Sequence, residues 1–260
     1  MAIVEVKDLM VRFGGLVAVK NVSFNLNEQE ILAVIGPNGA GKTTVFNLLT
    51  GVYQATAGEI RYRGELINDV KAHKRVKLGI SRTFQNIRLF KSLTVLENVF
   101  VGQESWAEES LLAALLLGKK TRQDRVAAIE QAMHCLEIVG LENKKEEYAT
   151  SLPYGEQRLL EIARALASNP SVVLLDEPAA GMNPSEKERL KNLIRFLRTE
   201  LNKTVLLIEH DMRVVMDISD RIVVLDHGEK IAEGLPEEIR SNNSVIEAYL
   251  GREGSRHVNE

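Results

Sequence analysis

The stretch that decides the fold is ILAVIGPNGAGKTT, residues 31–44. Its first five residues form a continuous apolar run, which is typical of a strand buried on both faces. The next eight fit the pattern G-x-x-x-x-G-K-[ST], whose glycines let successive backbone N–H groups face an anion. A helix expected from Lys42 to about Thr50 points its positive N-terminus at the same place. This order predicts a phosphate loop rather than a plain glycine-rich turn, with Lys42 on the β- and γ-phosphates and Thr43 on Mg²⁺.

A second apolar run, Val172–Leu175, is followed at once by Asp176 and Glu177. Open α/β sheets bind ligands at the C-terminal ends of their strands, so both carboxylates are expected near the phosphate loop. Asp176 can hold Mg²⁺ directly or through water, and Glu177 can orient an attacking water. An acidic turn after a strand is common by itself, but beside a phosphate loop it favours a hydrolytic site.

The remaining patterns predict how the chain is organised around these two motifs. Alternating apolar and charged residues in 3–13 predict a half-exposed edge strand, with further antiparallel strands at 17–19 and 22–26 and a hairpin over 58–66. Residues 94–150 show helical spacing, with helices expected at 97–103 and 111–118 and most clearly in 126–136 up to a stop at Gly140. Helices are then expected at 159–168, 186–201 and 211–219, and strands at 172–175, 205–208, 221–225 and 230–233. We expect an α/β phosphate-loop core, an N-terminal antiparallel β-subdomain and a helical subdomain inserted near 88–165, forming one domain over 1–250 with a polar tail at 251–260.

Composition excludes several classes of protein. Of 260 residues, 33 are basic and 36 acidic, and this near-neutral balance argues against a dedicated nucleic-acid binder. The longest apolar runs are far shorter than the roughly 20 residues of a membrane-spanning helix, and the N-terminus lacks the pattern of a secretory signal. The single cysteine, Cys135, excludes an intrachain disulfide and is expected to fill a core position.

Two segments leave alternatives open. Residues 61–91 carry nine Lys/Arg against Glu65 and Asp69, which fits either a solvated face or an approach to an acidic membrane partner or anionic lipid. Trp106 and the run 111–117 fit helix packing within the lobe, or else a membrane-contacting patch.

With these motifs in this order, residues 3–250 resemble the ATP-binding subunit of an ATP-binding cassette (ABC) transporter. The resemblance implies ATP and Mg²⁺ as cofactors, with Mg²⁺ held by Thr43, Gln85 and Asp176, and catalysis by Glu177, His210 and Gln85. Its ATP-binding residues are Phe13, Gly36, Pro37, Asn38, Gly39, Ala40, Gly41, Lys42, Thr43 and Thr44. Phe13 would stack on adenine, although it also fits a plain core aromatic at a strand end.

The family's signature, LSGGQ, appears here as LPYGEQ in residues 152–157. The resemblance implies that Pro153, Tyr154, Gly155 and Glu156 act in trans, on a nucleotide bound by a partner subunit. Pro153 replaces the usual serine and Tyr154 the first glycine. Asn183 replaces the usual aspartate of the inter-subunit loop. These departures fit either a weakened ATP site between two subunits or a sequence feature shared by a subfamily.

The segments LPYGEQR and EPAAGMNP, with a long insertion at 104–123, look like the ATPase of branched-chain amino acid importers. That resemblance implies a head-to-tail homo- or heterodimer, separate transmembrane permease subunits, a periplasmic or extracellular substrate-binding protein, and a place on the cytoplasmic face of the cell membrane, with no nucleic acid. The alternatives are the ATPase of a urea or lipopolysaccharide transporter, or a soluble cassette protein acting on ribosomes or DNA. The last is disfavoured because such proteins usually carry two cassettes or large added domains.

Overall fold

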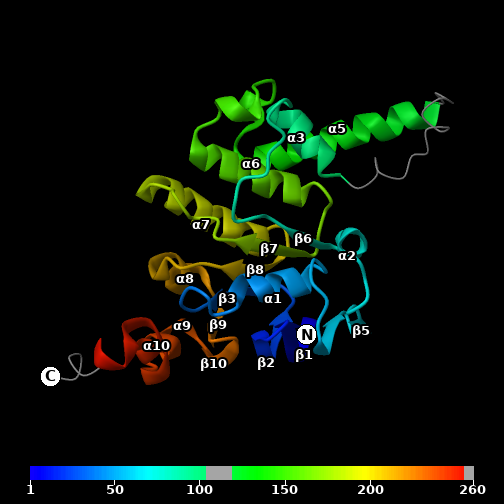
Figure 1. Cartoon of the computed structure of the whole chain (residues 1–260). Helices are drawn as coiled ribbons and strands as arrows, with labels where there is room; N and C mark the ends of the chain where they lie inside the picture. The colour runs from blue at the N-terminus through cyan, green and yellow to red at the C-terminus, as the bar shows by residue number, and fades with distance from the viewer. Residues whose placement is uncertain (104–118, 255–260) are drawn as a thin grey trace.

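The computed structural model describes residues 1–103 and 119–254, arranged in three layers (Figure 1). A helical lobe lies above a central sheet, and a second, antiparallel sheet lies below it. The helix expected at 111–118, Trp106 and the run 111–117 lie outside the described residues.

The central sheet places the phosphate loop between parallel strands. Its order is β10-β9-β3-β8-β7-β6, with β3 (Ile31–Ile35) flanked in parallel by β8 (Thr204–Ile208) and β9 (Arg221–Asp226). Beyond them lie β7 (Val172–Asp176), the three-residue edge strand β6 (Ile80–Arg82) and, antiparallel on the other edge, β10 (Glu229–Gly234). Every residue of β3, β7 and β8 is buried, as their apolar runs predict. The carboxyl ends of these strands therefore meet at one edge.

The antiparallel sheet corrects one expectation. Its order is β2-β1-β4-β5, so β1 (Ala2–Phe13) is an inner strand, paired on both sides, and not an edge strand. Its charged residues are exposed because only one face of this sheet is packed. The two short strands expected next form one strand, β2 (Leu16–Asn27), which contains Asn21 at φ 51°. The hairpin is β4 (Ala57–Tyr62) with β5 (Glu65–Leu66).

The helices of the core flank the central sheet. They are α1 (Lys42–Leu49), α7 (Pro184–Thr199) and α8 (Met212–Ile218), as expected, together with α2 (Ala72–Leu78), α9 (Pro236–Arg240) and α10 (Asn243–Gly254). Helices α2, α9 and α10 and strand β6 were not expected from the sequence, because each is short or lacks a clear apolar stripe. Helix α10 extends into the segment expected as a polar tail.

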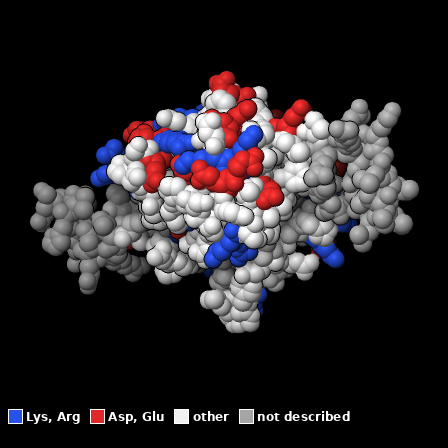
Figure 2. Space-filling model, turned by 90° about the horizontal axis from the view of Figure 1, so that it is seen from above, with Lys and Arg blue, Asp and Glu red and all other residues white. Residues whose placement is uncertain are grey.

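The helical lobe is built from α3 (Val95–Val101), α5 (Lys119–Val139) and α6 (Tyr154–Leu166), with single turns at Glu142–Lys144 and Ala149–Ser151. Cys135 is buried in its core. Helix α6 begins five residues before the expected start at Leu159, because Pro153 occupies its N-cap position and the signature residues form its first turn. Seen from above, acidic and basic side chains lie next to one another on the molecule (Figure 2).

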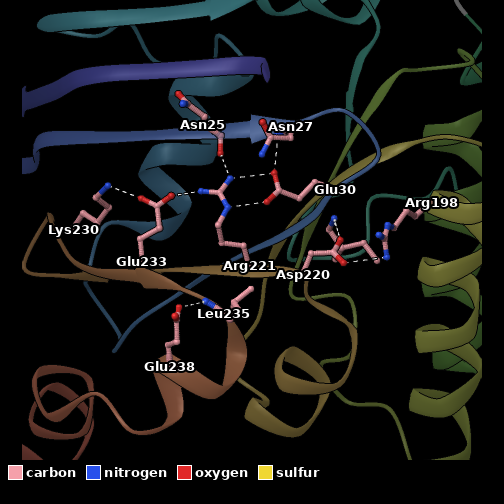
Figure 3. Close-up of polar contacts among 11 residues, drawn as sticks. Asn25, Asn27, Glu30, Arg198, Asp220, Arg221, Lys230, Glu233, Leu235 and Glu238 are labelled. Atoms are coloured by element: carbon pink, nitrogen blue, oxygen red, sulfur yellow. Dashed lines mark hydrogen bonds and ion pairs between the residues drawn. The ribbon is translucent and has the colours of Figure 1, made fainter. Parts of the chain in front are cut away.

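A polar cluster joins the lower sheet to the core (Figure 3). The guanidinium of Arg221, at the start of β9, pairs with Glu30 at 2.8 Å and with Glu233 of β10. It also donates to the carbonyl of Asn25 in β2 at 2.5 Å. Glu30 in turn accepts from the backbone N–H of Asn27 at 2.7 Å. Strands β2, β9 and β10 are thereby fixed to one another.

Among the nine basic residues in 61–91, Arg75 is buried and the side chain of Arg82 is only 8% exposed, so not all of them lie on a solvated face. Arg75 is 1% exposed and donates to five carbonyls at the end of α1 and in the loop before α2, those of Leu48, Leu49, Ile67, Asn68 and Val70. Arg82 is paired with Asp176 behind the phosphate loop. No described helix has both the length and the apolar character needed to span a membrane.

Candidate functional site

A cavity of about 490 Å³ opens over the phosphate loop. Among the residues predicted to bind ATP or to act in catalysis, those lining it are Asn38, Gly39, Ala40, Gly41, Lys42, Thr43, Thr44, Gln85 and Glu177. Gly36 and Pro37 lie at the base of the loop. The ring of Phe13 lies outside this lining and is 44% exposed, edge-on to Tyr53 at 5.1 Å. Leu16, Val17 and Ala18 of β2 form the cavity wall instead.

Two glycines of the loop are required by geometry. Gly36 has φ 148°, and a Cβ added there would lie 2.0 Å from the carbonyl oxygen of Leu225. Gly41 has φ 99°, and its Cβ would lie 2.8 Å from the carbonyl oxygen of Ala18. Any other residue would push the loop away from the neighbouring strands.

Lys42 is held inside the loop that it serves. Its Nζ donates to the carbonyls of Gly36 at 2.7 Å and Pro37 at 2.9 Å. The side chain is buried, and burial lowers its pKa, while the charges of Glu177 and Asp176 act in the opposite direction. An ammonium has three donors, so one donor is left for a bound phosphate.

The three predicted catalytic residues converge on one oxygen atom. Glu177 Oε2 accepts from Gln85 Nε2 at 3.1 Å and lies 3.7 Å from His210 Nδ1. Glu177 adopts φ 49°, a left-handed conformation unusual for a residue with a side chain, and its N–H donates to the carbonyl of Ile208 at 2.9 Å. The strands β6, β7 and β8 lie side by side, and the segments that follow them bring an amide, a carboxylate and an imidazole together.

Asp176 directly precedes Glu177 and is the last residue of β7. Its Oδ2 accepts from Arg82 at 2.7 Å, and its buried Oδ1 has no hydrogen-bond partner in the described structure. Burial raises the pKa of Asp176, and the charge of Arg82 opposes that shift. This free carboxylate oxygen, the Thr43 hydroxyl and the Gln85 amide oxygen are the hard oxygen ligands that Mg²⁺ prefers, so the donor set fits that ion.

Glu209 is a functional candidate that the sequence reasoning missed. Its fully buried carboxylate accepts from the backbone N–H of Ala179 at 2.7 Å and of His210 at 3.1 Å. It therefore fixes the loop that follows Glu177 and the segment that carries His210. The sequence did contain a signal for Glu209. This residue comes directly after the apolar run of β8, just as Asp176 and Glu177 come directly after the apolar run of β7.

The signature residues lie apart from this cavity. Gly155 packs so closely against α7 that a Cβ there would lie 2.4 Å from Glu186 Oε1. Glu186 forms a capping box with Asn183, the N-cap of α7. Glu156 pairs with Lys144 at 2.6 Å, and Pro153 offers no side-chain hydrogen bond to α6. None of these four signature residues lines the cavity over the phosphate loop.

Comparison with known proteins agrees with this geometry. Residues 19–180 match the family described as ABC transporter, and residues 229–255 match the family described as branched-chain amino acid ATP-binding cassette transporter. The chain is 51% identical, over 249 residues, to the high-affinity branched-chain amino acid transport ATP-binding protein BraF of Pseudomonas aeruginosa, covering 96% of this chain and 98% of that protein.

Solved structures give the same result. An ATP-binding cassette of an ABC transporter in its ADP conformation has a TM-score of 0.83 and 32% identity, covering 97% of this chain and 100% of the other. A cassette solved as a dimer in a post-hydrolysis state, bound to ADP and Pi, has a TM-score of 0.74 and 28% identity, covering 90% and 98%. The similarity in sequence and the similarity in fold both extend along nearly the whole chain, so this protein belongs to the ABC transporter family, as one of its ATP-binding cassettes.

Proposed function

We propose that this chain binds and hydrolyses ATP to power the uptake of branched-chain amino acids through separate permease subunits at the cytoplasmic face of the membrane. Support for the transported solute comes from the 51% identity to a protein named for that transport and from the match of residues 229–255. The signature LPYGEQ does not begin Leu-Ser-Gly, the form that would favour a lipopolysaccharide transporter.

The observation that carries the hydrolytic assignment is the convergence of Gln85 and His210 on Glu177 Oε2 beside the phosphate loop. The loop N–H groups and Lys42 bind and orient the β- and γ-phosphates, and Phe13 is proposed to stack on the adenine. Glu177 then orients a water molecule in line with the γ-phosphate and accepts its proton at Oε2.

Thr43, Asp176 and Gln85 are the residues that would hold Mg²⁺. When bound, this ion neutralises charge on the β- and γ-phosphate oxygens. Arg82 fixes one oxygen of Asp176 and opposes the rise in the pKa of this carboxyl that burial causes. The other oxygen has no hydrogen-bond partner in the described structure, so it is the one proposed to meet the ion.

The position of the signature supports a head-to-tail dimer. Pro153, Tyr154, Gly155 and Glu156, with Asn183, would close the nucleotide of a partner cassette, so that each chain contributes half of two sites. The dimeric cassette bound to ADP and Pi is a precedent in a relative of this fold.

The test replaces Glu177 by glutamine, which keeps its size but removes its basicity. ATP hydrolysis should fall by about a hundredfold or more while ATP still binds. Glu200→Gln, at an exposed position after α7, is the matched control and should hydrolyse ATP at the wild-type rate. Near-normal hydrolysis by Glu177→Gln would remove that residue from the role of base.

The same two variants test the transported solute in cells that lack the wild-type chain. Cells with Glu200→Gln should take up labelled leucine, isoleucine and valine, and cells with Glu177→Gln should not. Uptake of all three by both strains, with urea uptake lost in the Glu177→Gln strain, would favour the alternative transporter.

A further inference from the structure

A second cavity, of about 520 Å³, lies between helices α8, α9 and α10, which are next to one another in the fold (Figure 1). It shares no lining residue with the cavity over the phosphate loop. Its lining is largely apolar, and the aliphatic and thioether side chains in it are those of Met212, Met216, Ile239, Val245 and Ile246. An apolar cavity of this size is typical of sites that bind small molecules.

Two guanidinium groups, those of Arg213 on α8 and Arg240 on α9, line the same cavity. Both residues are exposed, and neither side chain is in an ion pair within residues 1–103 and 119–254. No carboxylate is among the described residues that line the cavity. The cavity therefore combines apolar surface with positive charge, which fits a ligand with an aliphatic body and an anionic head.

The same lining indicates which anion fits. A guanidinium presents its donors in a planar fork that matches the two oxygens of a carboxylate. An amino acid also carries an ammonium beside its carboxylate, and the burial of that charge without a partner is unfavourable. A monocarboxylate without an amino group therefore matches this cavity better than an amino acid does.

Tyr249 of α10 connects the cavity to the phosphate loop. The residue lines the cavity, and its hydroxyl accepts a hydrogen bond from the backbone N–H of Gly36, the first residue of the loop. Ile239 and Val245 of the lining also belong to the same small core as Ile35, which directly precedes Gly36. A ligand that enters between α8 and α10 would move Tyr249 away from Gly36 and leave that N–H without its acceptor.

We propose that this cavity binds an aliphatic monocarboxylate, either a fatty acid or a 2-oxo acid, and that the bound ligand weakens ATP binding by withdrawing the Tyr249 hydroxyl from Gly36. Arg213 and Arg240 hold the carboxylate, and the apolar side chains hold the aliphatic body. The binding of the carboxylate is independent of the proposed function, whereas its effect on ATP rests on that function.

The first experiment titrates the full chain without nucleotide and follows binding by calorimetry. Octanoate is the fatty-acid probe, and 4-methyl-2-oxopentanoate is the 2-oxo acid probe. Both should bind more tightly than leucine, which has the carbon skeleton of the 2-oxo acid but carries an ammonium. Octanoate should bind at least about tenfold more tightly than butyrate, because it buries four more methylenes. The tighter of the two probes identifies the source of the ligand.

The double variant Arg213→Gln/Arg240→Gln tests the site of the carboxylate. It should weaken octanoate binding by about tenfold, because an exposed ion pair contributes up to about fivefold to an equilibrium constant. Lys7→Gln/Lys74→Gln removes the same charge from exposed positions outside the cavity and is the matched control. Equal dissociation constants for the two double variants would overturn the site, and so would an absence of octanoate binding or a preference for leucine.

The second experiment measures the dissociation constant for the non-hydrolysable analogue AMP-PNP with Mg²⁺, at a concentration where the chain sediments as a monomer. In the wild type, saturating octanoate should raise this constant by at least about fivefold, which is the lower end of measured allosteric couplings. Tyr249→Phe keeps the ring and removes the acceptor. It should bind AMP-PNP more weakly without octanoate, and octanoate should then change the constant by less than about twofold. Tyr148→Phe, at an exposed tyrosine of the helical lobe, is the matched control and should respond like the wild type.

A wild-type response to octanoate in Tyr249→Phe would overturn the coupling. Octanoate that binds the wild type without changing the dissociation constant for AMP-PNP would overturn it as well. A wild-type chain that binds no AMP-PNP would refute the proposed function and the coupling with it, whereas the titration without nucleotide decides the carboxylate site independently.

Discussion

At the scale of single residues, Glu209 determines a measurable dependence of stability on pH. Burial raises the pKa of its carboxyl, although hydrogen bonds from Ala179, Asp211 and His210 oppose the shift. Between the ordinary pKa and the raised one, the folded chain binds a proton that the unfolded chain does not. This contribution therefore makes the folded state more stable as the pH falls.

Glu209→Gln removes that titration. The free energy of unfolding of the wild type, relative to this variant, should therefore rise as the pH is lowered from about 7 to about 5. Urea unfolding at both pH values measures the difference, and ionisation of the groups that do not interact with Glu209 cancels in the comparison. A difference that stays constant with pH would show that the Glu209 carboxyl has its ordinary pKa.

At the scale of elements, Arg75 connects the end of α1 to the loop before α2 through five carbonyls. Burial without a carboxylate partner lowers its pKa to about 10. Arg75→Met should destabilise the chain by about 3 kcal/mol, because several buried carbonyls lose their donors together. Lys74→Met, one residue earlier and exposed, should leave the urea midpoint unchanged. Equal midpoints for the two variants would refute this role of Arg75.

The elements also show how much could be predicted from sequence. Strands β3, β7 and β8 were predictable because a strand buried on both faces is apolar at every position. The inner position of β1 was not, because strand order depends on pairing with the distant strand β4, as between Val4 and Tyr62, and not on the residues of β1 alone. The early start of α6 was hidden by Pro153, which suggests a loop but occupies the N-cap.

The same distinction holds for the candidate site. The placement of Lys42, Asp176 and Glu177 near one another was predictable, because each residue follows a buried strand directly or lies in the glycine-rich loop after one. The buried roles of Arg75 and Arg82 were not, since their partners are backbone carbonyls and a carboxylate that only the folded chain brings near. A count of charges along 61–91 cannot separate such residues from exposed lysines.

At the scale of the whole molecule, the separation of the signature from the cavity predicts association driven by nucleotide. With ATP and Mg²⁺, the Glu177→Gln chain should sediment at about twice the 29.0 kDa of one chain, because ATP is bound and not consumed.

Adding Gly155→Asp should keep that chain monomeric, because the added side chain collides with Glu186 of the same chain and displaces the signature turn proposed to face the partner. Gly64→Asp, in open space on the β4–β5 hairpin, is the control and should still allow dimers. Dimers of the Gly155→Asp chain would argue against the head-to-tail arrangement.

The left-handed backbone conformation of Glu177 implies that this residue lowers the thermal stability of the chain while it serves ATP hydrolysis. Holding a residue with a side chain at φ 49° costs about 1 kcal/mol that glycine does not incur. Its charge also adds to the effect of burial in raising the pKa of Asp176. Glu177→Gly should therefore melt about 2–4 °C higher than the wild type while hydrolysing no ATP. Glu177→Gln keeps the backbone strain, so its melting temperature should rise by less. The carboxylate proposed for hydrolysis would then stand at a position where glycine would make this protein more resistant to heat.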